Sequence, residues 1–393
     1  MPSDTYSLYI HIPFCRRRCS YCDFNTSVGQ GSLIPAYFDA LRREIRAVSR
    51  SAPQRLPVDT IYFGGGTPTV APVKEIATLL QYITECFDLA SDAEITIEAN
   101  PGTVSASTFM QLQRAGINRI SFGMQTAHPT ELEMLERLHS YPNVLQAFIR
   151  ARRAGFDNLS LDLIYGLPGQ TLERWRQTIE LALKFQPVHL SLYALTLEPG
   201  TPLHARVENG LLPPPDDDLS ADMYEWACER LSINRFLHYE ISNWALGKER
   251  ICRHNMQYWR NHPYLGLGAG AHGFATGRRL ANESDTLRYI QRCHNPVSGS
   301  FPLSPATAQK TIVSKTDEMG ETLMVGLRLV QEGVSSRDFE KRFGQTLDSV
   351  FGDRITRLCQ LGLLEWSLPA QHRRLRLTPR GRLLGNQVFM EFI

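Results

Sequence analysis

The stretch YIHIPFCRRRCSYCDF, residues 9–24, runs from a short apolar segment into three closely spaced cysteines, Cys15, Cys19 and Cys22. The other five of the eight cysteines are scattered singly along the chain. Cysteine thiolates hold iron–sulfur clusters, and a Cys-x3-Cys-x2-Cys loop is short enough for its three sulfur atoms to hold one cubane. Three thiolates on four irons leave one iron open to a small molecule. The spacing therefore predicts a [4Fe–4S] cluster with an open iron.

A zinc site is the alternative for this cysteine loop. A structural zinc ion takes four Cys or His ligands, and the nearest further candidate, His11, lies four residues upstream of Cys15 on the apolar segment. The spacing is also tighter than the two separated ligand pairs of a zinc finger. A zinc knuckle and a coincidental group of thiols stay open, but the flanking aromatic residues Phe14, Tyr21 and Phe24 would shield a cluster.

Composition excludes several classes of protein. The chain has 393 residues, with 42 Lys and Arg against 40 Asp and Glu, and a formal net charge of +2. This balance excludes a strongly polybasic nucleic-acid coat and an acidic tail. No uncharged apolar run approaches the roughly 18 residues that a membrane-spanning helix needs, and Met1–Ser7 lacks the features of a secretory signal. We expect a cytoplasmic protein of two or three domains without a disulfide framework.

Short apolar segments alternate with amphipathic segments in the first half of the chain. The apolar segments are expected to be strands, at Ser7–Ile12, Val58–Phe63, Glu94–Ala99, Asn118–Phe122, Leu159–Ile164 and His189–Ala194. The amphipathic segments are expected to be helices, at Ala36–Ser49, Val73–Phe87, Ser105–Ala115, Asn143–Ala154 and Leu172–Phe185. This alternation predicts an α/β fold with a parallel sheet, either open or curled into a partial (β/α) barrel.

Glycine-rich or polar motifs follow the predicted strands. The cysteine loop follows the first strand, and the next four strands are followed by GGGTP at 64–68, NPG at 100–102, GMQ at 123–125 and GLPG at 166–169. Ligands of parallel α/β folds bind at the C-terminal ends of the strands. These motifs therefore predict one binding site at that edge of the sheet.

The pattern changes after about residue 200. The Gly-rich stretch Gly266–Gly277 is expected to be a loop region. From Lys315 onward helical patterns dominate, and two strand-like pieces, Leu363–Trp366 and Arg374–Thr378, indicate a winged-helix-like arrangement. We expect three regions, which are a partial barrel at 1–244, a connecting region at 245–300 and a smaller, mainly helical domain at 301–393.

The cysteine loop with its upstream segment resembles the signature of radical S-adenosylmethionine (SAM) proteins. More narrowly, it resembles the oxygen-independent coproporphyrinogen III oxidase group. Four further motifs agree with that group, namely GGGTPT at 64–69, EANP at 98–101, SFGMQ at 121–125 and DLIYGLP at 162–168. The resemblance extends over nearly the whole chain, and the motifs are highly specific as a set.

The resemblance implies a SAM site. In that superfamily the amino and carboxylate groups of SAM bind the open iron, and one electron from the cluster cleaves SAM to methionine and a 5′-deoxyadenosyl radical. By resemblance, Gly65 and Gly66 allow close backbone approach, and Thr67 offers its hydroxyl and backbone N–H to the methionyl part. Glu98 accepts hydrogen bonds from ribose hydroxyls or an ammonium. The other matched contacts are Tyr9, Tyr21, Gln125, Arg137 and Asp162, among which Arg137 suits a carboxylate. A helix-capping role stays the alternative for Glu98 and Asp162.

Two features depart from the coproporphyrinogen III dehydrogenases. Phe24 occupies the position of a fourth cysteine in the dehydrogenase signature, and only about a dozen residues precede Cys15, where the dehydrogenases have a longer segment that helps to bind the tetrapyrrole. The run RHNMQYW at 253–259 instead resembles the His-Asn-x-x-Tyr-Trp mark of the heme-chaperone branch, the HemW family. That resemblance implies that His254 contacts heme and that Tyr258 and Trp259 stack on it. A structural role for His254 and a thiolate ligand from Cys252 stay as alternatives.

The sequence therefore predicts a heme chaperone that binds heme, a [4Fe–4S] cluster and SAM and delivers heme to acceptor proteins. The alternative is a coproporphyrinogen III dehydrogenase, which would decarboxylate two propionates to vinyls, so the patterns leave open whether the chain is an enzyme. A regulatory winged-helix protein is a third class. The basic run His372–Arg376, with Arg380 and Arg382, is expected to be a solvated face that could contact a partner, heme propionates or an anionic membrane surface, and nucleic acid is not an expected partner.

Overall fold

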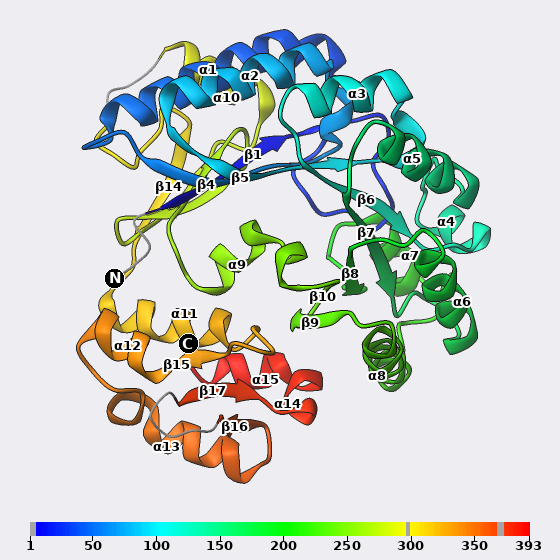
Figure 1. Cartoon of the computed structure of the whole chain (residues 1–393), viewed down its shortest axis with the longest axis vertical. Coiled ribbons are helices and arrows are strands. Elements are labelled where there is room, and N and C mark those ends of the chain that lie inside the picture. The colour runs from blue at the N-terminus through cyan, green and yellow to red at the C-terminus, as the bar shows by residue number, and fades with distance from the viewer. Residues whose placement is uncertain (1–4, 296–298, 368–372) are drawn as a thin grey trace.

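The computed structural model describes residues 5–295, 299–367 and 373–393. Its main feature is a 12-stranded sheet in the order β14-β13-β12-β11-β1-β4-β5-β6-β7-β8-β10-β9. The six central strands are parallel neighbours, and they are β1 (Tyr6–Ile12), β4 (Pro57–Gly65), β5 (Asp88–Ala99), β6 (Arg119–Gln125), β7 (Asn158–Tyr165) and β8 (His189–Ala194). All six predicted strands are therefore confirmed. The sheet curls without pairing its two edges, which makes it a partial barrel (Figure 1).

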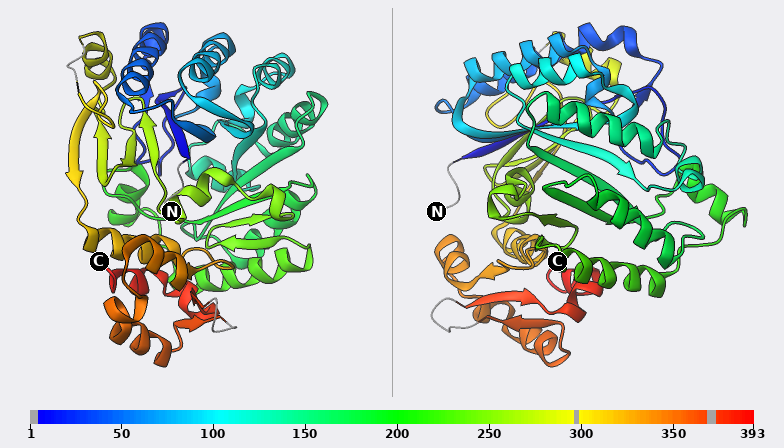
Figure 2. Two further views of the ribbon diagram at one scale, coloured as in Figure 1. Left: turned by 60° about the vertical axis from the view of Figure 1, so that its left-hand side comes forward. Right: turned by 45° about the vertical axis from the view of Figure 1, so that its right-hand side comes forward.

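Helices cover the convex face of this sheet (Figures 1 and 2). The five predicted crossover helices are α1 (Ile34–Ser51), α2 (Val73–Cys86), α3 (Ala106–Arg114), α5 (Tyr141–Arg153) and α6 (Leu172–Leu183). Each buries one apolar stripe, as Tyr37, Leu41, Ile45 and Val48 do at helical spacing in α1. Further helices of the described chain are α4 (Pro129–Met134), α7 (Pro202–Glu208), α8 (Asp217–Ile233) and α10 (Thr286–His294).

The later strands extend both edges of the sheet. On one side β11 (Tyr264–Leu267) runs parallel to β1 and is followed by antiparallel β12 (His272–Ala275), β13 (Arg278–Asn282) and β14 (Thr307–Ile312), and on the other lie β10 (Asn243–Ala245) and β9 (Leu237–Glu240). The expected loop at Gly266–Gly277 is wrong in part, because half of that stretch lies in β11 and β12. A Cβ atom on Gly266 would overlap the carbonyl oxygen of His272, so the glycines there serve close strand approach.

The helix α9 (Arg253–Trp259) lies on the concave side of the sheet (Figure 1). It carries the His-Asn-x-x-Tyr-Trp run. The side chain of Glu94, on β5, accepts hydrogen bonds from the backbone N–H groups of Arg253 and His254 at 3.0 and 3.1 Å. A carboxylate at a helix N-terminus is favourable, so β5 fixes the start of α9 inside the curve of the sheet.

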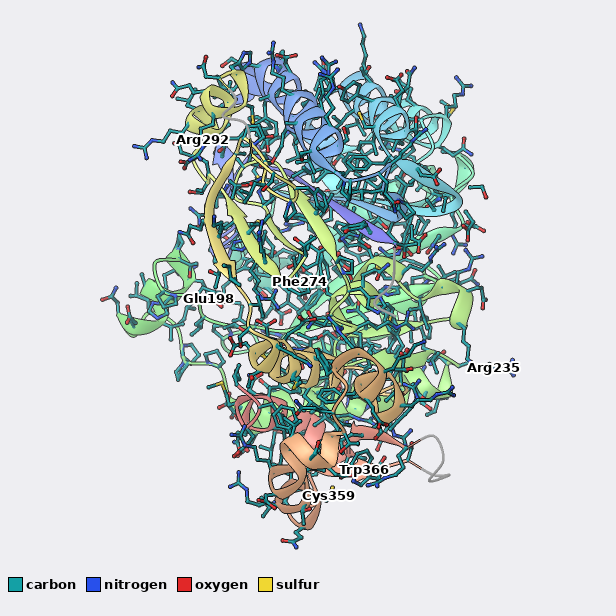
Figure 3. All side chains as sticks on the ribbon, turned by 90° about the vertical axis from the view of Figure 1, so that its left-hand side faces the viewer. Glu198, Arg235, Phe274, Arg292, Cys359 and Trp366 are labelled. Carbon is teal, nitrogen blue, oxygen red and sulfur yellow. The ribbon has the colours of Figure 1, made fainter. Side chains whose placement is uncertain are left out.

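A separate core forms the C-terminal part of the chain, seen at the bottom of Figures 1 and 2. Its helices are α11 (Lys315–Gly326), α12 (Ser336–Phe343), α13 (Leu347–Gln360), α14 (Pro379–Leu383) and α15 (Gly385–Met390). Its small sheet has the order β15 (Val334–Ser335), β17 (Arg374–Leu377), β16 (Leu364–Trp366). Trp366 and Cys359 lie in this part in Figure 3. The predicted mainly helical, winged-helix-like arrangement is confirmed, while the division at residues 244 and 300 stays a prediction.

Within the described ranges, no helix is long and apolar enough to span a membrane.

Candidate functional site

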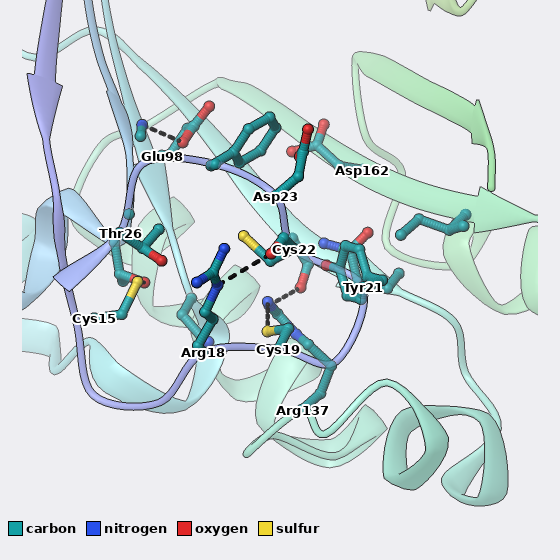
Figure 4. Close-up of a pocket in the computed structure, with 18 of the residues that line it drawn as sticks. Cys15, Arg18, Cys19, Tyr21, Cys22, Asp23, Thr26, Glu98, Arg137 and Asp162 are labelled. Carbon is teal, nitrogen blue, oxygen red and sulfur yellow. Dashed lines mark hydrogen bonds between the residues drawn. The ribbon is translucent and has the colours of Figure 1, made fainter. Parts of the chain in front are cut away.

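A cavity of about 360 Å³ opens at the C-terminal ends of the parallel strands (Figure 4). It is lined by all the site residues that the sequence predicts except Tyr9 and His254. The lining members of that set are Cys15, Cys19, Tyr21, Cys22, Gly65, Gly66, Thr67, Glu98, Gln125, Arg137 and Asp162. The structure thus brings together side chains from the cysteine loop and from the ends of β4, β5, β6 and β7.

Backbone hydrogen bonds fix the cysteine loop over this cavity. Short strands β2 (Phe14–Cys15) and β3 (Ser27–Val28) pair at the two ends of the loop. The N–H groups of Gly66 and Thr67 donate to the carbonyl oxygens of Ile12 and Phe14, both at 2.9 Å. The glycine-rich segment after β4 therefore holds the start of the cysteine loop in place.

Gly65 and Gly66 pack closely against the segment that leads into the cysteine loop. A Cβ atom on Gly66 would lie 2.6 Å from the carbonyl oxygen of Pro13, and Gly65 has a φ of 111° and faces the ring of His11. The N–H of Thr67 is already bonded within the chain, so only its hydroxyl, 3.6 Å from the sulfur of Cys15, faces the cavity contents. The role expected for the Thr67 N–H stays a prediction, and it would require this backbone bond to be shared or released.

The three thiols fit a cluster better than a single metal ion. Among the described residues, no three His, Cys, Asp or Glu side chains converge closely enough to hold one ion. In a [4Fe–4S] cubane each cysteine thiolate binds a different iron, so the three cysteine sulfur atoms do not converge on one point. Burial raises the pKa of the Cys22 thiol to about 11. Iron binding would have to displace that proton, as metal binding to thiols generally does.

Two half-buried carboxyl groups also line the cavity. Glu98 accepts hydrogen bonds from the Tyr62 hydroxyl at 2.8 Å and from the Gly65 N–H at 3.3 Å, and burial raises its pKa to about 7. Asp162 accepts from the Ser121 hydroxyl at 2.9 Å, and burial also raises its pKa. These donors lie on strands, so neither carboxyl group caps a helix.

The Arg137 side chain is one of three arginines that line the cavity, with Arg17 and Arg18. Its Nη1 donates to the sulfur of Cys19 at 3.4 Å, and its Nη2 donates to the carbonyl of Gly123 at 2.7 Å. Its Nε is buried and has no hydrogen-bond partner among the described residues. Strand β6 ends close to Arg137. At its end the register with β7 shifts between Gly123 and Gln125, and Gln125 has a left-handed φ of 66°. An unsatisfied buried guanidinium donor fits a carboxylate-bearing ligand such as SAM.

Comparison with known proteins agrees with this geometry. Residues 9–182 match the radical SAM superfamily, and residues 313–384 match the HemN C-terminal domain. The protein named heme chaperone HemW in Bacillus subtilis is 37% identical over 390 residues, which cover 98% of this chain and 99% of that relative. This chain belongs to the HemW family. A HemW of Lactococcus lactis is 36% identical and covers 98% and 97% of the two chains.

A solved structure extends the comparison to the fold. Coproporphyrinogen III oxidase (HemN) of Escherichia coli superposes with a TM-score of 0.83 over 99% of this chain and 90% of that chain, at 23% sequence identity. The predicted radical SAM fold and the predicted HemW family are therefore both confirmed.

In this HemW family member, His254 lies apart from the cavity. It is 1% exposed, its Nδ1 lies 2.7 Å from the Thr60 hydroxyl, and its Nε2 lies 2.9 Å from the Tyr258 hydroxyl. Burial lowers its pKa to about 3. Tyr9, which stacks on Tyr62 at 6.2 Å, belongs to the same buried group. In this arrangement His254 has no free nitrogen for heme iron.

The alternative ligand Cys252 is also engaged. Its buried thiol donates to Glu94 at 3.5 Å, and burial raises its pKa to about 12. The thiol is thus held protonated away from any cavity contents.

Sequence reasoning missed several residues that line the cavity. Tyr62, Ser121 and Tyr193 project into it from β4, β6 and β8. The sequence does carry a signal for these residues. Side chains that point to the inside of a curled sheet are two residues apart along each strand. Thr60, Tyr62 and Gly64 are polar, aromatic and small at that spacing inside an otherwise apolar strand.

Acidic neighbours pair with the basic run near the C-terminus. Arg373, Arg374 and Arg376 lie 3.6, 3.8 and 3.2 Å from carboxylate oxygens of Asp348, Glu332 and Glu365. His372 lies outside the described residues. The pairing leaves a mixed-charge face and removes the main support for a DNA-reading wing.

Proposed function

We propose that this chain is a heme chaperone, which binds heme and passes it to acceptor proteins, and that its cavity holds a [4Fe–4S] cluster and SAM. The observation that carries the proposal is similarity over nearly the whole chain to proteins named as heme chaperones. The cofactor part is supported independently, because the cysteine loop, the unsatisfied Arg137 donor and two carboxyl groups line one cavity.

The residues of the cavity have separate tasks in this proposal. Cys15, Cys19 and Cys22 would bind three irons. Arg137 would bind the carboxylate of SAM, and Glu98 would accept hydrogen bonds from its ribose or ammonium group. When bound, the cluster and SAM supply one-electron chemistry that the protein side chains lack. The chain contributes placement, charge and exclusion of water.

Phe24 favours the chaperone over the dehydrogenase. Its side chain is 63% exposed and lines the mouth of the cavity. By resemblance the dehydrogenases carry a thiol at this position. A phenyl ring can neither donate a proton nor bind iron, so it supports a site without the complete dehydrogenase chemistry. The dehydrogenase stays the alternative function.

The proposal places the protein in the cytoplasm and makes heme-acceptor proteins its partners. Contact of the basic run with a membrane surface is a further prediction. For His254 to bind heme iron, Tyr258 would have to release the Nε2 atom, so this assignment requires α9 to rearrange.

Anaerobic titration with hemin tests the proposal. The reconstituted chain should bind hemin saturably at one equivalent per chain, with a Soret band distinct from that of free hemin. Protein with all three loop cysteines changed to Ser is the matched sample, and it reports whether heme binding depends on the cluster. Absence of saturable binding by the intact chain would contradict the chaperone function.

A further inference from the structure

A second cavity of about 290 Å³ lies where the residues after α9 meet the C-terminal domain. Trp259, Arg260 and His262 line it from one side, and Val334, Phe339 and Lys341 are among the lining residues from the other. It shares no lining residue with the cysteine-loop cavity. The two sides are tied by Arg342, which donates to the carbonyl oxygen of Asn261 at 2.9 Å. Neither the cluster nor SAM accounts for this cavity.

The hydrogen bonding of His262 leaves one ring nitrogen available to bind a metal. Its Nδ1 lies 2.9 Å from the amide oxygen of Gln257, which can only accept a hydrogen bond, so Nδ1 carries the proton. The Nε2 atom therefore keeps its lone pair, and nothing in the described part of the chain hydrogen-bonds to it. Burial, assisted by the charges of Arg260 and Arg342, lowers the pKa of His262 to about 4, so the ring is neutral at neutral pH. A ring N–H bonded to a carbonyl is the usual support of a metal-binding imidazole.

The walls of the cavity suit a flat apolar ring. Trp259 and Phe339 supply aromatic surface, with Leu329 and Val334 beside them. The guanidinium of Arg328 lies 5.2 Å from the centre of the Trp259 ring, which fixes the indole by a cation–π contact. Aromatic rings stack favourably on other π-systems in an offset arrangement.

The charge of the cavity suits an anionic group. Its lining includes four cationic side chains and two acidic ones, which are Arg260, Lys341, Arg342 and Arg374 against Glu332 and Asp338. Arg260 and Arg374 share Glu332, at 2.7 and 3.8 Å. Lys341 forms no ion pair with any described residue. Arg342 is also paired, with Glu318 at 2.5 Å. Lys341 is therefore the lining cation that is available to a propionate of heme.

We propose that heme binds in this cavity, with Nε2 of His262 as its axial ligand and its propionates toward Lys341. The proposal rests on the heme-chaperone function and names its binding site. It also divides the His-Asn-x-x-Tyr-Trp run into two roles. His254 and Tyr258 bond to each other inside the barrel, whereas Trp259 faces the heme.

The size of the cavity agrees with a cargo site. Ligand pockets usually measure about 300–1,000 Å³, so a cavity of about 290 Å³ would hold one edge of the macrocycle and leave the rest exposed. An exposed edge allows an acceptor protein to contact heme before the axial bond breaks.

Hemin titration of the reconstituted full chain with four variants tests the site. His262→Ala should weaken hemin binding by about tenfold or more and shift the Soret band, and added imidazole should restore the wild-type spectrum because it fills the vacated ligand position. Lys341→Gln should weaken hemin binding severalfold but leave binding of the heme dimethyl ester unchanged, because the ester lacks the propionate charges. His294→Ala, on exposed α10, is the control and should behave as wild type.

Tyr258→Phe distinguishes the two histidines. It frees Nε2 of His254 and should leave hemin affinity unchanged if His262 is the ligand. Stronger binding in Tyr258→Phe, or an unaltered spectrum in folded His262→Ala, would overturn the assigned site while the chaperone function stands. Failure of the wild-type chain to bind hemin would instead overturn the function itself.

Discussion

The hydroxyl of Thr60 lies 2.7 Å from Nδ1 of His254 and joins the second parallel strand of the barrel to helix α9. Thr60 donates its own proton to Ser7 at 2.7 Å, so the imidazole must be the donor in the Thr60 bond. Nε2 of His254 then accepts from Tyr258 at 2.9 Å. The four side chains form one hydrogen-bond chain that uses both ring nitrogens of His254, which makes His254 a fixed part of the barrel interior.

Replacing His254 by Ala should therefore destabilise the protein. The variant loses two buried hydrogen bonds and leaves the Tyr258 hydroxyl without its partner, and an unsatisfied buried group costs about 1–3 kcal/mol. We expect the free energy of unfolding to fall by about 2–4 kcal/mol in denaturant titrations. His294→Ala is the exposed control. A change within about 0.5 kcal/mol for His254→Ala would contradict the structural role.

Changing Cys15, Cys19 and Cys22 together to Ser should remove the cluster. The serine hydroxyl is a much poorer iron ligand than the cysteine thiolate that normally holds such a cluster. Anaerobically reconstituted triple variant should lack nearly all iron, sulfide and charge-transfer absorption. Cys86→Ser, outside the cavity, should keep them. Full retention of iron and sulfide in the triple variant would show that the cluster lies elsewhere.

Gly66→Ala should disturb the cysteine loop. Its Cβ atom would lie 2.6 Å from the carbonyl oxygen of Pro13, and backbone there cannot move without shifting the loop. We expect lower cluster occupancy and weaker SAM binding together, measured by iron content and equilibrium binding. Gly352→Ala, on α13 with no atom within 4 Å of the added Cβ, is the matched control and should stabilise by about 0.5–1 kcal/mol. Normal occupancy with weakened SAM binding alone would place Gly66 against the ligand instead.

The affinity for SAM should rise with pH through the titration of Glu98. Burial, with the negative charge of Asp162, raises the Glu98 pKa to about 7, while hydrogen bonds from Tyr62 and Gly65 oppose that shift. A ligand that donates hydrogen bonds to the carboxylate binds its ionised form, which becomes populated only above that pKa. Affinity should increase by about fivefold to tenfold between about pH 6 and pH 8. Glu98→Gln should abolish this dependence in equilibrium binding without reductant, and an identical pH profile in the variant would exclude Glu98.

The barrel and its ligand edge could be predicted from the sequence because their signals are local. Strand β1 and the cysteine loop are adjacent in the chain, and the glycine-rich turn after β4 is itself a motif. The crossover rule for parallel strands then places those segments at one edge. Glu98, Arg137 and Asp162 followed from the motif resemblance and lie in one cavity.

Long-range contacts could not be predicted in this way. The Gly266–Gly277 stretch reads as a loop, yet Gly266 and Gly273 allow the close antiparallel pairing of β11 and β12. The His254 motif gave no sign that the ring faces Thr60, which is 194 residues away in the chain. His262 carried no local motif, and its fixed tautomer depends on the turn that follows α9.

The proposed function makes heme the cargo of this protein and excludes coproporphyrinogen III as its substrate. The direct measurement is anaerobic incubation of the reconstituted chain with SAM, a reductant and coproporphyrinogen III, followed by quantitative product analysis. With Phe24 in place of a thiol at the cavity mouth, we predict less than one equivalent of protoporphyrinogen IX per chain, from a preparation that binds hemin. Multiple-turnover formation of protoporphyrinogen IX would contradict the account and identify the chain as a dehydrogenase.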